Sequence, residues 1–304
     1  MFMKVMEKMK KLLDNCTLCP YNCKVNRETE KLGVCKASDK LKIALASLHF
    51  YEEPCISVEK GSGTIFFSNC NLQCVYCQNY EISQENKGKE ISIDELADIM
   101  IKQQDKNANN INLVSPTIYV PLIIEAIKIA KKNGLKIPII YNTSGYEKIE
   151  TLKMLEGYID VYLPDFKYFF NELAIKYSKA PYYVEYATSA IKEMYRQVAY
   201  PKLDENGIIK KGLIIRHLVL PNQIENSKKV LKWIEQNIDN RVFVSVMAQY
   251  FPCYQAKKMH GLNRKLTKDE YAEIENYLYN LNLENGYIQE LGEHEEEYVP
   301  KFDI

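Results

Sequence analysis

Three closely spaced cysteines constrain this chain more than any other feature of its sequence. Cys70, Cys74 and Cys77 lie in the segment FFSNCNLQCVYCQNY with the spacing C-x3-C-x2-C. They follow a short apolar stretch, Thr64–Ser68, which we expect to form a strand. Three thiolates on one loop can converge on a single inorganic centre. A 4Fe-4S cluster normally takes four cysteine ligands, so three cysteines predict a cluster in which one iron stays open.

An open iron determines the chemistry that such a cluster can support. It can bind the amino and carboxylate groups of a methionine moiety and hold the sulfonium of S-adenosylmethionine (SAM) beside the cluster. One-electron reduction then breaks the S–C5′ bond and releases a 5′-deoxyadenosyl radical, while the protein orients the cofactor and excludes water. We interpret Tyr76, between the last two cysteines, as an aromatic wall against the adenine ring.

A zinc site is the alternative interpretation of the same three cysteines. Cys55 or a histidine would then supply the fourth ligand. Structural zinc sites usually combine two pairs of closely spaced ligands, and this group has no second pair attached to it. The spacing therefore favours the open cluster over zinc.

A second group of cysteines lies near the start of the chain. Cys16, Cys19, Cys23 and Cys35 have the spacing C-x2-C-x3-C-x11-C. Four soft ligands can enclose one metal completely, and such a closed site is structural zinc by default. A second iron–sulfur cluster that passes electrons to the first is the alternative. The residues predict coordination by four cysteines, and they leave zinc, iron–sulfur and the absence of metal open.

The composition argues against several classes of protein. The chain has 304 residues, with 40 Lys and Arg against 40 Asp and Glu and a formal net charge of zero. No strong global field therefore attracts nucleic acid or an anionic membrane. We predict no transmembrane helix, because no run of about eighteen apolar residues occurs, and the first residues lack the features of a signal peptide. Nine cysteines without an export signal indicate metal or redox chemistry in the cytoplasm.

Around and after the group of Cys70, Cys74 and Cys77, strand and helix patterns alternate along the chain. This alternation predicts a mostly parallel α/β sheet of about six units, either a partial or complete β/α barrel or a doubly wound sheet. In both architectures the chemistry lies at the carboxyl ends of the strands. The expected strands are 64–68, 111–114, 137–141, 158–163, 213–220 and 242–247, and the expected helices are 92–104, 119–132, 147–155, 169–178, 182–198, 225–238 and 267–281.

The motif C-x3-C-x-aromatic-C after a short strand resembles the signature of the radical SAM superfamily. Over nearly the whole chain, longer segments resemble its pyruvate formate-lyase-activating-enzyme-like (PflX) subgroup. The resemblance implies a partial (β/α)6 TIM-type barrel over residues 61–304, preceded by a Cys-rich metal-binding extension over residues 1–60. The segments that carry it are CTLCPYNCKVNR, GVCKA, HFYEEPCIS, GSGTIFFSNCNLQCVYCQNYEIS, NLVSPTIYVP, YNTSGYE, YLPDFKY and RHLVLP.

The resemblance also implies where SAM is held. The superfamily's Gly-Gly-Glu stretch, which binds the SAM amino group, is replaced here by Ser-Pro-Thr, so Ser115 or Thr117 would supply the oxygen ligand. Asn142 and Ser144 end the third strand, where activating enzymes contact the carboxylate and ribose of SAM.

Charged residues complete the implied site. Asp165 and Lys167 match the Asp-x-Lys motif of the activating enzymes, with an ordinary surface pair as the alternative. Arg216 and His217 end the fifth strand, and only one of them can face the barrel interior because neighbours on a strand point to opposite sides. We favour Arg216 as the contact to SAM or substrate.

Three functions remain open from the sequence. The first is a radical SAM enzyme that abstracts hydrogen from a backbone glycine of a glycyl radical protein, with flavodoxin or ferredoxin as electron donor, as the resemblance implies. The second keeps the radical chemistry and acts on a small molecule or another protein. The third, from a different class, is a non-catalytic zinc-binding interaction protein.

Overall fold

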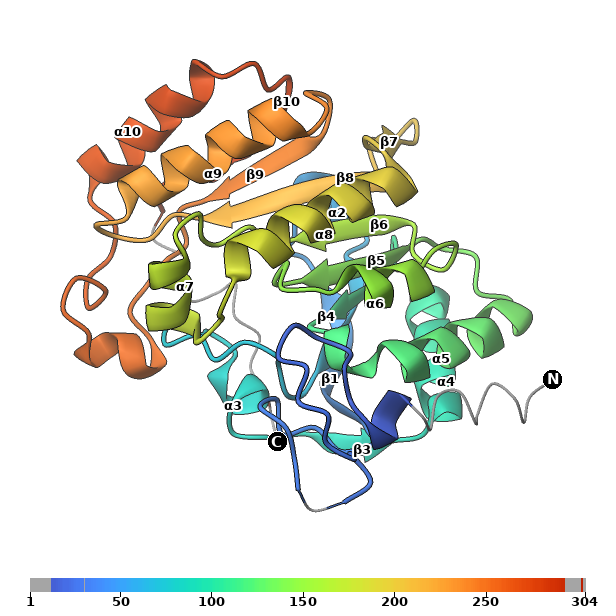
Figure 1. Cartoon of the computed structure of the whole chain (residues 1–304). Coiled ribbons are helices and arrows are strands. Elements are labelled where there is room, and N and C mark those ends of the chain that lie inside the picture. Colours follow the sequence, from blue (N-terminus) through green and yellow to red (C-terminus); the bar gives the residue numbers. More distant parts are fainter. Residues whose placement is uncertain (1–11, 30, 293–301, 303–304) are drawn as a thin grey trace.

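A computed structural model describes residues 12–29, 31–292 and 302 of the chain (Figure 1). Its described part contains a 10-stranded sheet with the order β10-β9-β8-β6-β5-β4-β2-β1-β3, and β7 pairs with β8 beside this path. The strands are β1 (Leu41–His49), β2 (Ser62–Phe67), β3 (Lys89–Ile91), β4 (Ile111–Val114), β5 (Ile139–Thr143), β6 (Val161–Pro164), β7 (Lys202–Leu203), β8 (Ile209–Leu218), β9 (Phe243–Met247) and β10 (Asn285–Ile288).

Along the path β10-β9-β8-β6-β5-β4-β2, neighbouring strands are all parallel, which confirms the predicted α/β fold with a mostly parallel sheet. Helices join these strands, and Figure 1 shows α5, α6, α8 and α9 along one face of the sheet. The helices are α2 (Pro54–Ser57), α3 (Tyr80–Ser83), α4 (Ile93–Asp105), α5 (Val120–Lys132), α6 (Ile149–Met154), α7 (Asn171–Ser178), α8 (Tyr183–Val198), α9 (Ile224–Asn237) and α10 (Lys268–Tyr279).

Two of these helices begin where capping residues predict. Ser92 caps α4, because its hydroxyl accepts the backbone N–H of Glu95 while the Glu95 carboxylate accepts the N–H of Ser92. Thr267 and Glu270 make the same reciprocal pair at the start of α10. Each capping box satisfies two backbone donors that the first turn would otherwise leave unpaired.

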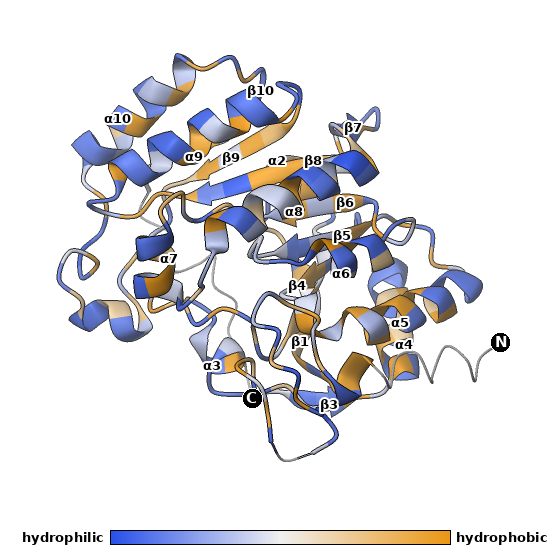
Figure 2. Ribbon diagram, in the orientation of Figure 1, coloured by the Kyte–Doolittle hydropathy of each residue, from blue (hydrophilic) through white to orange (hydrophobic). Residues whose placement is uncertain are grey.

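The apolar residues of the strands alternate between two separate cores. On the helix side, Tyr141, Ile215 and Val244 belong to the main core, and Figure 2 shows hydrophobic colours along the central strands beneath more hydrophilic helices. On the other side, Ile140 and Ile214 belong to a smaller inner cluster. This period of two fixes which polar residues at the strand ends face the interior.

The N-terminal extension is part of the same structure. β1 pairs antiparallel with β2, and the following loop enters the concave side of the sheet. There Cys55 and Ile56 of α2 pack in the inner cluster with Val161 and other strand residues. The sequence boundary at residue 60 therefore separates neither the sheet nor the core.

Candidate active site

A cavity of about 220 Å³ lies at the carboxyl ends of the parallel strands. Its lining residues come from the loop after β2, from the ends of β4, β5, β6, β8 and β9, and from the loop after β1. Every residue predicted to bind the cluster or SAM lines it, except Thr117. Those lining residues are Cys70, Cys74, Tyr76, Cys77, Ser115, Asn142, Ser144, Asp165, Lys167 and Arg216.

The three thiols of the loop after β2 each have a hydrogen-bond partner. The Leu72 N–H donates to Cys70 Sγ at 3.4 Å, and the Ser178 hydroxyl donates to Cys74 Sγ at 3.0 Å. Cys77 Sγ lies 3.2 Å from Ser83 Oγ. Burial raises the pKa of Cys70 and of Cys77 to about 12, so each needs a bound cation before it becomes a thiolate at neutral pH.

The two kinds of alternative fourth ligand for a zinc ion lie in different places. Cys55 is buried in the inner cluster rather than at the cavity, and burial raises the pKa of its thiol to about 12. His49 does line the cavity. Among the described residues, no three His, Cys, Asp or Glu side chains are arranged to hold one metal ion.

Arg216 organises a largely buried group of charges in the cavity. It donates from Nε to Asp165 Oδ1 at 2.8 Å, from Nη1 to Glu52 Oε2 at 3.1 Å and from Nη2 to Asn142 Oδ1 at 2.7 Å. Lys167 Nζ donates to the other oxygen of Asp165 at 2.6 Å. Two cations and two carboxylates therefore form one continuous network.

These contacts decide the charge of the network. Burial alone would raise the pKa of Asp165, but Arg216 and then Lys167 hold it below its ordinary value. Burial likewise would lower the pKa of Lys167, and Asp165 together with Cys74 raises it instead. Asp165 stays anionic and Lys167 stays cationic beside the thiol loop.

Glu52 is the residue of this network that the sequence analysis missed. It precedes α2 in the extension, its side chain is only 8% exposed, and Asn112 donates to its Oε1 at 2.8 Å. Burial raises its pKa, and Arg216 opposes that effect. Glu52 lies in the segment HFYEEPCIS, which is one of the segments that resemble the activating-enzyme-like subgroup. Two adjacent carboxylates before a proline were the one local signal.

His217 and Thr117 lie outside the cavity. His217 faces the helix layer, where its ring nitrogens lie 2.7 Å from the Phe166 carbonyl and 2.8 Å from Ser227 Oγ. Arg216 is therefore the one of the pair that faces the interior. The Thr117 hydroxyl donates to Glu147 Oε1 at 2.6 Å. Of the two predicted oxygen donors, only Ser115 reaches the cavity.

Unpartnered polar atoms in the cavity fit an additional polar ligand. Ser144 Oγ and Asn79 Oδ1 are buried without a hydrogen-bond partner among the described residues, and both residues line the cavity. Native proteins rarely leave such atoms unpaired. With three thiols alongside, this donor set suits an iron–sulfur cluster and a ligand as polar as SAM.

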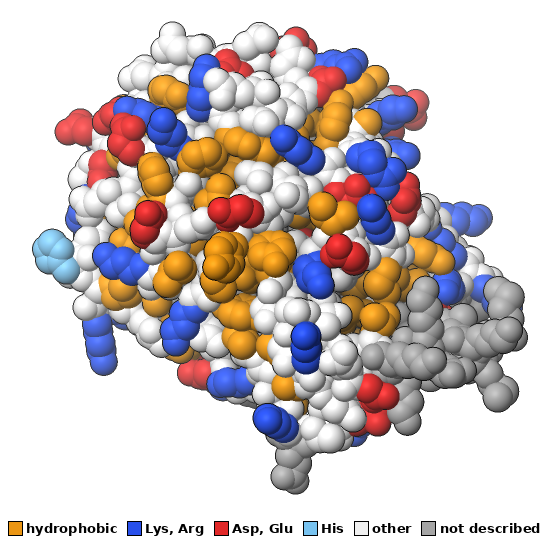
Figure 3. Space-filling view, in the orientation of Figure 1, with side chains coloured by type: hydrophobic (Ala, Val, Ile, Leu, Met, Phe, Trp, Pro, Cys, Tyr) orange, Lys and Arg blue, Asp and Glu red, His pale blue; other side chains and the backbone are white. Residues whose placement is uncertain are grey.

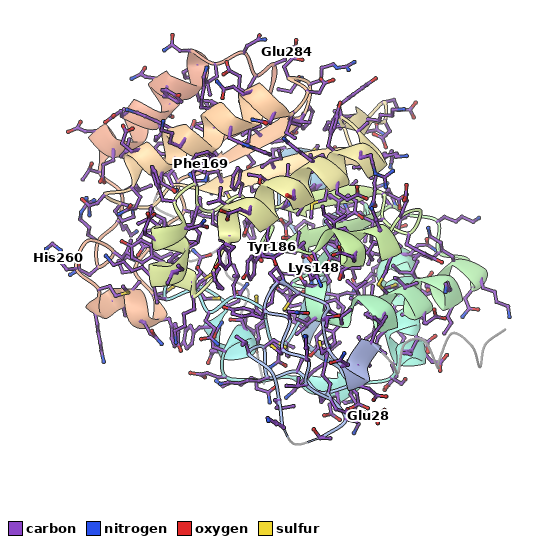
Figure 4. All side chains as sticks on the ribbon, in the orientation of Figure 1. Glu28, Lys148, Phe169, Tyr186, His260 and Glu284 are labelled. Atoms are coloured by element: carbon purple, nitrogen blue, oxygen red, sulfur yellow. The ribbon has the colours of Figure 1, made fainter. Side chains whose placement is uncertain are left out.

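A second, much smaller cavity is lined by four cysteines of the extension, Cys16, Cys19, Cys23 and Cys35. The extension packs on the rest of the structure through aromatic rings, since Tyr21 makes an edge contact with Tyr146 at 5.7 Å between centroids. Tyr146 makes another with Tyr186 at 5.7 Å, and Figure 4 labels Tyr186 where α8 borders the extension. The predicted metal at Cys16, Cys19, Cys23 and Cys35 stays a prediction.

The surface carries both charge signs. Figure 3 shows Lys and Arg interspersed with Asp and Glu, and apolar side chains gathered over α7 and the start of α8. Exposed Ile175 and Tyr182 belong to these two regions. No helix in the described part of the chain is long and apolar enough to cross a membrane.

Comparison with known proteins identifies the family. The description Radical SAM superfamily matches residues 64–234. An uncharacterized protein of Methanocaldococcus jannaschii, MJ0674, is 37% identical over 289 residues, which cover 90% of this chain and 78% of that protein.

Solved structures share the fold at low sequence identity. A mutant of spore photoproduct lyase superposes with a TM-score of 0.55 at 9% identity, covering 81% of this chain and 79% of that one. The protein anSMEcpe, solved with bound AdoMet and a peptide, gives 0.50 at 17% identity and covers 70% of this chain. This chain spans 57% of the length of anSMEcpe. The family match and the identity to MJ0674 show that the chain is a radical SAM enzyme, a member of a superfamily whose chemistry uses a 4Fe-4S cluster and SAM.

Proposed function

We propose that Cys70, Cys74 and Cys77 hold the 4Fe-4S cluster and that the surrounding cavity binds SAM for reductive cleavage. One observation carries the proposal. Three thiols, that of Cys74 buried and the other two partly buried, line the same cavity as Ser115, Asn142 and the other polar residues at the strand ends. When bound, the cluster and SAM supply one-electron cleavage of the S–C5′ bond and a 5′-deoxyadenosyl radical that abstracts hydrogen from the substrate.

The chain's own residues prepare this chemistry through a positive charge and through free polar oxygens. Lys167 lies beside Cys70 and Cys74, and its positive charge lowers their thiol pKa values against the effect of burial. Lys167 thus favours the thiolates that iron requires. Ser144 and Asn79 offer their unpartnered oxygens to the polar groups of SAM.

The cavity also keeps water away from a reactive centre. Tyr76 is 6% exposed, and its hydroxyl forms a hydrogen bond with the hydroxyl of Tyr168. An apolar wall protects a carbon radical from side reactions, because hydrocarbon side chains displace solvent. The apolar lining residues are Phe66, Phe67, Leu72, Ile82, Val114, Leu218 and Met247.

Anaerobic reconstitution tests the proposal directly. Protein loaded with iron and sulfide should show iron–sulfur charge-transfer absorption, an EPR signal perturbed by SAM, and release of 5′-deoxyadenosine on reduction. Colourless protein with stoichiometric zinc at both cysteine groups would instead support the non-catalytic zinc-binding function.

For the substrate we propose a backbone glycine of a glycyl radical protein. The support is the resemblance to activating enzymes in several segments, including Asp165 and Lys167. Incubation of the reduced enzyme and SAM with glycyl radical proteins from the same genome should give the doublet EPR signal of a backbone radical. No signal with any candidate would remove this substrate and leave SAM cleavage in place.

A small polar molecule is the second candidate substrate. The charged network of Glu52, Asp165, Lys167 and Arg216 lies inside the cavity and offers both signs of charge to a compact polar ligand. Deuterium transfer from a labelled small molecule into 5′-deoxyadenosine would favour it over the protein substrate.

A further inference from the structure

Two segments that line the cavity are joined behind it by one buried carboxyl group. Ser115 follows β4, residues 142–144 lie at the end of β5, and both segments line the cavity. The carboxyl group belongs to Glu147, which is only 1% exposed and lies outside the lining. It directly precedes Lys148, which Figure 4 labels at the start of α6. A residue in this place can act on a ligand of the cavity only through the segments that it joins.

The Glu147 Oε1 atom accepts hydrogen bonds from the hydroxyl groups of three residues. Thr117 donates at 2.6 Å from η1 (Thr117–Tyr119), the 3-10 helix after β4, and Tyr141 donates at 3.3 Å from β5. Thr143, the last residue of β5, is the third donor. Without this acceptor, buried hydroxyl groups would lose their partner, which is costly. Glu147 therefore ties the loop after β4 to the end of β5 from within the core.

A tight turn brings Glu147 back against β5. Gly145 has a φ of +75°, and a Cβ atom at this position would lie 2.8 Å from the carbonyl oxygen of Asp165, so the turn favours glycine. The Glu147 N–H donates to the Gly145 carbonyl at 3.0 Å. Asn71, from the loop that carries the three thiols, donates to the Tyr146 carbonyl at 2.7 Å. The turn thus fixes Glu147 directly after the residues that we expect to contact SAM.

The loop after β4 has a backbone conformation that needs support. Ser115 has a φ of +59°, in the left-handed region that residues other than glycine adopt only at a cost. Its N–H donates to the Asn142 carbonyl at 3.0 Å, and Thr117 then directs its hydroxyl to Glu147. Strained conformations persist only where surrounding contacts determine them. Since Glu147 supplies one of these contacts, its loss should let Ser115 move from its place at the cavity.

A second buried side chain holds the same loop from the other side. Arg27 is 1% exposed, and it donates from Nη1 to the Ile118 carbonyl at 2.5 Å and from Nε to the Ser38 carbonyl at 2.8 Å. These contacts do not involve Glu147. We therefore expect the loss of Glu147 to shift Ser115 rather than to unfold the loop.

We propose that Glu147 is a positioning residue that holds Ser115 and the end of β5 in the geometry that binds SAM. The inference rests on the proposed function of the cavity as the SAM site. Thr117, one of the two oxygen donors expected from the sequence, acts instead as the link between the loop and Glu147. Glu147 itself touches neither SAM nor the reacting atoms, so it acts on the affinity for SAM.

Calorimetric titration of SAM into the reconstituted full-length enzyme tests this role. Glu147→Leu removes the acceptor and Thr117→Val removes a donor, and neither residue lines the cavity. Each variant should raise the Kd of SAM roughly three- to tenfold, the effect of losing about one hydrogen bond. The double variant should bind SAM as weakly as Glu147→Leu alone, because both substitutions break the same link.

Conservative variants separate the position of the loop from a general loss of stability. Glu147→Gln keeps an oxygen acceptor and Thr117→Ser keeps the hydroxyl, so both should bind SAM with the wild-type Kd. Thr151→Val on α6 is the matched control, because it removes another buried hydroxyl, which donates to the Leu18 carbonyl at 2.7 Å. It should lower the free energy of unfolding as Thr117→Val does and leave the Kd of SAM unchanged.

The possible failures of the inference and of the proposed function are distinguishable. If the wild-type enzyme binds SAM and both Glu147→Leu and Thr117→Val bind it equally well, Glu147 does not position the site. Equal weakening in Thr151→Val would show a general effect of destabilisation and would also overturn the inference. If Glu147→Leu does not fold, an equal Kd for Thr117→Val and Thr117→Ser has the same meaning. A wild-type protein that takes up iron and sulfide but binds no SAM would refute the proposed function itself.

Discussion

Arg216 on β8 donates to Glu52 at 3.1 Å, which joins two residues 164 positions apart in the chain. The pair is largely buried, with 15% of the Arg216 side chain and 8% of the Glu52 side chain exposed. Removing charges from water is costly, and only complete pairing compensates for that cost. Glu52 thus fixes the guanidinium that also binds Asp165 and Asn142. The extension thereby contributes directly to the geometry of the cavity.

Glu52→Ala should destabilise the protein, because it removes the acceptor of hydrogen bonds from Arg216 and Asn112 and leaves a void in a buried position. We expect the free energy of unfolding to fall by about 3 kcal/mol, the usual cost of breaking a buried pair from one side. Urea denaturation measures this loss. Glu205→Ala, at an exposed turn position, is the control and should change little. Equal stability of the two variants would show that Glu52 contributes no net stabilisation.

Glu147→Gln should change how stability depends on pH. Burial raises the pKa of Glu147 from 4.5 to about 7. The folded state therefore binds this proton more tightly than the unfolded state does. The resulting stabilisation is fully present below pH 4.5 and is lost as the pH rises through 7.

Relative to Glu147→Gln, the wild-type protein should lose about 3 kcal/mol of unfolding free energy between pH 4.5 and pH 8, since each unit of pKa shift corresponds to about 1.4 kcal/mol. Urea denaturation across this range gives the difference. Glu150→Gln, on the exposed side of α6, should follow the wild-type curve. Parallel curves for wild type and Glu147→Gln would contradict the raised pKa.

Ser144→Ala should weaken SAM binding and leave the unliganded protein almost unaffected. The Ser144 hydroxyl oxygen has no partner in the described structure, so its removal breaks no existing bond. A lost hydrogen bond to SAM should raise Kd roughly three- to tenfold. Calorimetric titration of the reconstituted enzyme measures this change. Ser189→Ala on exposed α8 surface should bind SAM normally, and an unchanged Kd for Ser144→Ala would exclude the contact.

Cys74→Ala should abolish SAM cleavage, because the first cluster loses one of three ligands. The variant should release no 5′-deoxyadenosine and should lose the SAM-perturbed EPR signal. Cys55→Ala should retain both, since Cys55 lies in the inner cluster rather than at the cavity. Full cleavage by Cys74→Ala would mean that other residues ligate the iron.

Local chemistry made much of the fold predictable. The capping boxes at Ser92 and Thr267 set helix starts that depend only on residues three positions apart. The alternation of β8 required that one of Arg216 and His217 face the interior, and the structure places Arg216 there. The cysteine loop after β2 could be predicted as a site for one inorganic centre because its three thiols lie within eight positions.

Contacts distant in sequence could not be predicted in this way. β1 went unpredicted because most of its residues are only partly buried, so LKIALASLH lacks a clear alternation. It is held by β2 and β3 on either side. Glu52 belongs to no local sequence motif. Its role depends on its contact with Arg216, which lies 164 positions away in the chain. Thr117 turns from the cavity because a 3-10 helix follows β4 and presents its hydroxyl to Glu147.

The loop and helix that fill the concave side of the sheet also constrain how the chain can fold during synthesis. Ile56 leaves the ribosome long before Val161 and Ile214, with which it shares the inner cluster, and Glu52 leaves it long before its partner Arg216. Contacts of such long sequence separation form late, because a long stretch of chain must first close. The interior of the sheet must therefore form around the segment of Glu52 and Ile56, which is synthesised first. The strands that are synthesised last determine when this segment becomes buried.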